Sequence, residues 1–224
     1  MNRRMHVNFE GKELSQTRFN EIEKYVLEYF HGIWTDVRES IYLLRKKNSK
    51  LVKSELSLVF IGADALSRFG EIVTTGKEEK TSQKRFRDWI DSFVISERNE
   101  AYNKHRPEIG CNSFVLWKLR NSLLHFFGLP EKELICFAAV DEVTRKSFKD
   151  YVVRARPGQR LIVVNPYRLI EAVLQGFLMQ TESLMEMIKG NNDSEKEVYV
   201  KGILKCYQII QNEGTVHVPF NKKQ

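Results

Sequence analysis

One apolar stripe runs through the first part of this 224-residue chain at the spacing of an α-helix. Between Thr17 and Lys47, apolar side chains recur every three or four positions, so they lie along one side of a long amphipathic helix. The stripe consists of Phe19, Ile22, Val26, Phe30, Ile33, Val37, Ile41 and Leu44. Such a helix has to bury its stripe against other helices, which constrains the chain to a mainly α, antiparallel helical bundle. We expect one interruption, near Gly32.

Two further helices follow, and each has its own end signals. Leu51–Val73 is a more apolar run that should end at Gly76, because glycine readily takes the left-handed conformation that closes a helix. A third helix should begin after Thr81 or Ser82, since either side chain can cap a first turn, and extend to about Ser96.

The segment after the third helix is polar. Glu97–Gly110 contains Pro107, and this composition predicts a loop. Asn112 or Ser113 should then cap a fourth helix, which the turn residues Gly128–Pro130 end.

The pattern changes in the second half of the chain. Leu134–Val140, Tyr151–Val153 and Leu161–Val164 are short β-branched or aromatic runs separated by charged or Pro/Gly turns. They predict a small β hairpin or meander, inserted at about 134–164. The last core helix follows as Tyr167–Ile188, with Pro166 at its first position.

The chain shows no linker that would separate two domains. We therefore expect a single domain over residues 1–224, with a core at about 15–190. A final segment, Glu197–Ile210, has helical character, and a flexible C-terminal tail should begin at about residue 212.

Composition favours an ordinary cytoplasmic protein without a membrane segment. The longest apolar stretch, Leu56–Leu66, is broken by Asp64 and is far shorter than the roughly 20 residues that a spanning helix needs. Met1–Leu14 has basic residues but no hydrophobic block, so it does not resemble a secretory signal. The three cysteines have no paired or metal-type spacing, which favours reduced thiols and makes zinc improbable.

The chain carries a net charge of +7, and basic surface attracts phosphate backbones. The excess is concentrated in four clusters, Arg45–Lys53, Lys84–Arg87, Arg145–Lys149 and Arg154–Arg160. Each cluster is also compatible with an ordinary solvated helix face or turn. Only their convergence on one groove would make them a binding site.

The fourth helix, Leu116–Gly128, carries polar residues where a core helix normally has none. Its apolar stripe is Leu116, Leu119, Leu123, Phe126 and Phe127. Asn121 and His125 are four positions apart and share another face, and Arg120 lies at the edge of that face. A titratable imidazole and a permanent cation are thus placed together on a rigid element.

The absence of other motifs narrows the chemistry. We find no Gly-rich phosphate loop, no His-Glu-x-x-His pattern and no nucleophile turn, so we expect neither a metal nor a cofactor. What remains is acid–base and electrostatic chemistry, and RNA suits it because its own 2′-hydroxyl can attack the adjacent phosphate. His125 would then move protons, and Arg120 would donate hydrogen bonds to the phosphate.

The run from Arg120 to His125, Arg-Asn-Ser-Leu-Leu-His, resembles the signature of HEPN domains, an all-helical superfamily of ribonucleases and related modules. The resemblance covers roughly residues 15–190 and implies a HEPN-like bundle in which the motif helices of a homodimer face each other. It also implies metal-independent RNA cleavage that leaves 2′,3′-cyclic phosphate ends. By this resemblance Arg120 and His125 are catalytic, and Asn121 orients them.

Two structural alternatives compete with this hypothesis. Arg98 and Asn99, followed by His105, fit a looser version of the motif, but we set them aside because they fall in the predicted loop. Arg120 could also simply pair with a carboxylate such as Asp64, although Arg68, four residues after Asp64, is the partner we favour for that carboxylate.

Two classes of function therefore remain open. The first is a dimeric endoribonuclease in a toxin or defence setting, and the second is a non-catalytic helical module that binds RNA or a protein partner. Some HEPN toxins have a tyrosine two residues after the histidine that a partner enzyme modifies, whereas this chain has Phe127. An inhibitor or antitoxin would then have to act by binding alone.

Overall fold

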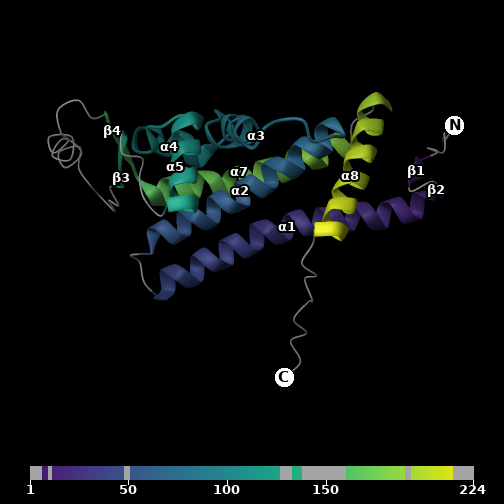
Figure 1. The fold of residues 1–224 in the computed structure, drawn as a ribbon, viewed down its shortest axis with the longest axis horizontal. Helices are drawn as coiled ribbons and strands as arrows, with labels where there is room; N and C mark the ends of the chain where they lie inside the picture. Colours follow the sequence, from purple (N-terminus) through teal and green to yellow (C-terminus); the bar gives the residue numbers. More distant parts are fainter. Residues whose placement is uncertain are drawn as a thin grey trace, which may run out of the picture.

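The structure is a computed structural model that describes residues 7–9, 12–47, 51–126, 133–137, 160–189 and 193–213. It is mainly helical, as the periodicity predicts, and its long helices lie side by side or cross one another (Figure 1). These long helices are α1 (Gln16–Lys47), α2 (Val52–Thr75), α7 (Pro166–Lys189) and α8 (Asp193–Glu213). The shorter ones are α3 (Ser82–Trp89), η1 (Ile90–Val94), α4 (Glu100–Ile109), α5 (Ser113–Asn121) and η2 (Ser122–Phe126), where η marks a π-helical turn.

The first two helices follow the sequence prediction closely. Six residues of the α1 stripe are buried, namely Phe19, Ile22, Val26, Phe30, Val37 and Ile41. The break expected near Gly32 is absent, because α1 continues through that residue without interruption. Helix α2 ends as predicted at Gly76, whose φ of 76° is left-handed and whose N–H donates to the carbonyl of Ile72 at 2.8 Å.

Helix α8 belongs to the core and packs across α2 (Figure 1). A Cβ on Gly202 would lie 2.5 Å from the carbonyl oxygen of Ile72 and from the Cα of Val73, so only glycine permits this close approach. Buried side chains of α8 are Tyr199, Val200, Ile203, Leu204, Cys206 and Ile210. The apolar core therefore continues beyond residue 190. The predicted C-terminal tail lies beyond Glu213, outside the described residues.

The predicted loop Glu97–Gly110 is wrong, since most of it forms helix α4. Asn99 begins this helix, because its Oδ1 accepts from the N–H of Tyr102 at 2.9 Å. Its Nδ2 also donates to the carbonyls of Phe93 and Ala172, each at 2.8 Å, and thereby ties the helix to η1 and α7. Pro107 does not end the helix but distorts it, and the backbone at His105 is non-helical.

The β segments also differ from the prediction. Strands β3 (Glu133–Phe137) and β4 (Arg160–Val164) lie where strands were expected, but they pair in parallel and so form neither a hairpin nor a meander. Their register places Leu134 opposite Leu161. Parallel pairing requires a crossover connection, and the composition of the strands does not encode that choice. The third expected strand, Tyr151–Val153, lies outside the described residues.

Two further strands, β1 (Val7–Phe9) and β2 (Lys12–Leu14), form an antiparallel pair before α1 that the sequence did not lead us to expect. Within the described ranges, no helix is long and apolar enough to cross a membrane.

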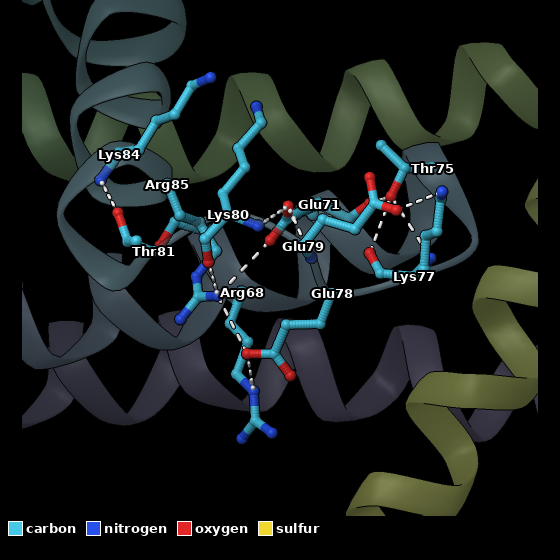
Figure 2. A network of polar contacts seen from close by, with 12 residues as sticks. Arg68, Glu71, Thr75, Lys77, Glu78, Glu79, Lys80, Thr81, Lys84 and Arg85 are labelled. Atoms are coloured by element: carbon cyan, nitrogen blue, oxygen red, sulfur yellow. Dashed lines mark hydrogen bonds and ion pairs between the residues drawn. The ribbon is translucent and has the colours of Figure 1, made fainter.

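A buried ionic network fixes α3 against α2 (Figure 2). The Glu71 carboxylate is 3% exposed, and its Oε1 accepts from the backbone N–H of Lys80 at 2.8 Å and of Glu79 at 3.3 Å. Nη1 of Arg85 donates to Glu78 Oε1 at 2.9 Å and lies 3.4 Å from Glu71 Oε2. These bonds hold the connection after α2 in one conformation, and so they set the position of α3, on which α5 packs.

Candidate functional site

Helix α5 carries the motif and is anchored by its cap and its apolar stripe. Oδ1 of Asn112 accepts from the N–H of Val115 at 3.0 Å, which confirms the predicted cap. The described part of the predicted stripe is buried, with Leu116 and Leu119 at 0% and Leu123 at 1% exposure. The opposite side of α5 is therefore turned toward the surface in a fixed orientation.

The helix widens into the π-helical turn η2 at the point where the motif ends. In a regular α-helix, positions 120 and 125 are about 140° apart around the axis. A π-helical turn bonds residue i to residue i+5, so it reduces this angular offset, and such turns recur at functional sites. The backbone of His125 belongs to this turn, while its side chain lies outside the described residues, as do the side chain of Phe126 and all of Phe127.

Two side chains accept hydrogen bonds from the guanidinium of Arg120. Its Nη2 lies 2.5 Å from Oδ2 of Asp64 on α2, and its Nη1 donates to Oδ1 of Asn121 at 2.8 Å. Its Cζ also lies 5.0 Å from the ring centroid of Trp117. The Arg120 side chain is 14% exposed, so these contacts hold it at the edge of the surface.

The expected pairing of Asp64 with Arg68 is wrong. Nε of Arg68 instead donates to Oε1 of Glu78 at 3.0 Å. Asp64 is turned toward α5, where Arg120 is the more buried cation and depends more on a carboxylate. The structure thus confirms the alternative prediction, in which Arg120 pairs with Asp64.

Asn121 accepts a hydrogen bond from Arg120 and so orients its guanidinium. A guanidinium has only donors, so the amide oxygen of Asn121 has to face it, and the two N–H groups of the amide are directed away. Of the five N–H groups of Arg120, these two bonds use one on each terminal nitrogen. In the part of the chain that the structure describes, the buried Nε–H has no partner. One N–H on each terminal nitrogen is also left over there, which suits two oxygens of a phosphate. The arrangement can therefore present a fixed cation to an anionic group.

In the second candidate motif, Asn99 and His105 make contacts that stabilise the fold. Asn99 is fully buried in its capping role, and Arg98 is exposed. His105 is 8% exposed, and its Nδ1 lies 3.2 Å from Oε1 of Glu108. Oε2 of Glu108 in turn accepts from Nδ2 of Asn165 at 2.7 Å, which links α4 to the start of α7. Asn99 and His105 thus have separate structural roles, although our reason for setting the motif aside, a loop, was wrong.

The two basic clusters that the structure describes do not form one exposed patch. In Lys84–Arg87, Arg85 is buried in the ionic network, whereas Arg87 lies beside the ring of Phe114. In Arg45–Lys53, Arg45 pairs with the fully buried carboxylate of Glu55 at 2.9 Å. The clusters at 145–149 and 154–160 lie outside the described residues.

Sequence reasoning did not assign Phe114 or Arg87 to the neighbourhood of the motif. The spacing of Phe114, Lys118 and Asn121 could have revealed the first, because positions three and four apart share one side of a helix. Arg87 is on another helix, so no local pattern could have placed it there.

A pocket of about 220 Å³ opens between α2, α3 and α7, and neither Arg120 nor Asn121 lines it. Its charged side chains pair with one another, as Lys80 does with Asp88 at 2.7 Å. In the described part of the chain, no group of three or more His, Cys, Asp or Glu side chains is placed to hold a metal ion. Comparisons with family models, curated proteins and solved structures gave no match.

Proposed function

We propose that this protein is a metal-independent endoribonuclease of the HEPN type, with Arg120, Asn121 and His125 as its site. The observation that carries the proposal is the guanidinium of Arg120, which Asp64 and Asn121 hold so that, among the described residues, one N–H on each terminal nitrogen is left over. The histidine follows five residues later on the same rigid element, through a π-helical turn. A fixed cation beside a titratable ring is what cleavage of RNA by its own 2′-hydroxyl requires.

In the proposed reaction, the 2′-oxygen forms a bond to the adjacent phosphorus while the bond from phosphorus to the 5′-oxygen breaks. The 2′-hydroxyl loses its proton to a base, and the departing 5′-oxygen gains one, so the products are a 2′,3′-cyclic phosphate and a 5′-hydroxyl. An unperturbed imidazole has a pKa of about 6.5, so a histidine is the side chain suited to proton exchange near neutral pH, and we assign this role to His125. Arg120 stabilises the negative charge that grows on the phosphoryl oxygens.

We also propose that the protein acts as a homodimer through the motif helix, in a toxin or defence setting, and that an inhibitor or antitoxin protein restrains it by binding. The resemblance of the motif to HEPN domains supports the dimer. Ile61 adds support, because it is 52% exposed on α2 only three residues before Asp64, where an apolar contact with a second copy would bury it. Sedimentation at micromolar concentration tests the dimer, and a monomer would contradict it.

One observation favours the second candidate, a non-catalytic helical module that binds RNA or a protein partner. The Asp64 carboxylate neutralises Arg120, and an arginine in an ion pair can serve the fold alone.

The test is to incubate the purified protein with RNA in excess EDTA and to identify the new ends by mass spectrometry. Cleavage to 2′,3′-cyclic ends is expected, and Arg120→Ala should lower its rate by roughly 10²-fold. Asn121→Ala should lower the cleavage rate less than Arg120→Ala does, because an orienting hydrogen bond contributes about 1 kcal/mol. RNA that stays intact, or cleavage that does not follow the protein through purification, would leave the binding module as the better account.

A further inference from the structure

The exposed side of α5 carries an aromatic ring and positive charge on the approach to Arg120. Phe114, Lys118 and Asn121 are spaced by four and three residues, so they follow one another along one side of the helix. Phe114 is 41% exposed, which is unusual for so large an apolar side chain on a helix that buries a full stripe.

Two cations from different helices gather at the Phe114 ring. Nζ of Lys118 lies 4.5 Å from the ring centroid, and Cζ of Arg87, on α3, lies 5.4 Å from it. Both distances fall within the range of cation–π attraction, so the ring holds the two charges together. Phe86 on α3 packs against Trp117 on α5 with ring centroids 5.5 Å apart, and this contact fixes the two helices relative to each other.

Two acidic side chains, Asp88 and Asp91, lie close to Arg87 along the chain. Oδ2 of Asp88 pairs with Nζ of Lys80 at 2.7 Å. Oδ2 of Asp91 accepts a hydrogen bond from the hydroxyl of Ser113 at 2.8 Å, so this carboxylate is engaged at the start of α5. Lys118 lies three residues before Asn121 and seven before position 125, which corresponds to about 4.5 Å and 10 Å along the helix axis. The two cations are therefore placed beside the proposed cleavage site and not within it.

We propose that Arg87 and Lys118 form a phosphate subsite for a single-stranded segment of RNA on one side of the bond that is cleaved, and that Phe114 positions both cations. This inference rests on the proposed function. The charge is complementary to a phosphodiester backbone, and the separation from position 125 requires the strand to continue past the scissile bond. A single strand fits, because the 2′-hydroxyl has to align with the departing 5′-oxygen, which a rigid duplex does not allow.

The experiment measures the affinity for a short single-stranded 2′-O-methyl oligoribonucleotide, which cannot be cleaved, over a series of salt concentrations. Each phosphate contact on a single strand contributes about 0.7 to the slope of log affinity against log salt, and so about fivefold in affinity near 0.1 M salt. Arg87→Ala and Lys118→Ala should each lower the slope and the affinity by these amounts. Phe114→Leu, which keeps the bulk but removes the ring, should weaken binding in the same direction.

Lys24→Ala is the matched control, because Lys24 is 76% exposed on α1 and its loss removes the same charge. It should leave the slope unchanged. Slopes for Arg87→Ala and Lys118→Ala equal to that of the control, or a wild-type protein that does not bind the oligonucleotide, would overturn the subsite. Salt slopes that fall as expected in a protein that yields no cyclic phosphate ends would sustain the subsite and refute the nuclease. Cleavage to cyclic phosphate ends, together with variant salt slopes that do not change, would support the nuclease and refute the subsite.

Discussion

Replacing Asp64 by asparagine should destabilise the protein, because it leaves the Arg120 charge with poor compensation. Loss of one partner from a fully buried ion pair costs about 3–5 kcal/mol, and an exposed pair contributes about 1 kcal/mol or less. The Asp64 and Arg120 side chains are 26% and 14% exposed, so their pair lies between these limits. We expect Asp64→Asn to lower the free energy of unfolding by about 2 kcal/mol, which corresponds to a fall of about 4–8 °C in Tm for a chain of this size.

Denaturant titration followed by circular dichroism measures this loss, and Glu197→Gln provides the matched comparison. Glu197 also pairs with a cation, Lys201, but both side chains are about two-thirds exposed, so its replacement should change the stability little. A double-mutant cycle with Arg120→Ala should show that the two residues are coupled. Equal stabilities for Asp64→Asn and Glu197→Gln would refute the reasoning, since the partial burial of the pair would then have no energetic consequence.

Three further predictions concern the fold. Gly202→Ala should destabilise the chain by about 1–3 kcal/mol in denaturant titration, because a Cβ there would force α8 away from the backbone of α2. Asn99→Ala should lower the free energy of unfolding by about 3 kcal/mol in the same assay, since it removes a helix cap and leaves two carbonyls without their hydrogen-bond donor. Burial raises the pKa of the Cys111 and Cys206 thiols to about 12, above the value of 9.0 for an exposed thiol. The unfolded chain therefore loses these protons first, so the stability should fall as pH rises from about 9 to 12, by up to about 1.4 kcal/mol per pH unit for each thiol; a flat pH profile would contradict this.

The helices that could be predicted from the sequence are those whose signals are local. The α1 stripe, the left-handed Gly76 and the Asn112 cap each act within a few residues, so their effects are present in the sequence pattern itself. Helix α4 escaped prediction because tertiary contacts hold it in place, above all the bond from Asn99 to the carbonyl of Ala172 on α7. The parallel pairing of β3 with β4 escaped for a related reason, since strand direction depends on the connection and not on the strands.

The candidate site shows the same division. Arg120, Asn121 and His125 could be selected because they interrupt an apolar helix, and the described stripe around them is buried as expected. The partner of Asp64 could not be chosen reliably, because the nearest cation along the helix was not the cation that packing brought closest. Contacts between helices depend on crossing geometry, which a single sequence pattern does not specify.

The most direct test of the central claim compares the RNA cleavage rates of His125→Ala and His105→Ala in EDTA, with thermal unfolding to establish that both variants fold. His125 lies on the motif helix, whereas His105 is committed to Glu108 within the fold. The account predicts a loss of roughly 10²-fold or more for His125→Ala and nearly full activity for folded His105→Ala. Full activity of His125→Ala would contradict it, and loss confined to His105→Ala would show that the cleavage site lies on α4.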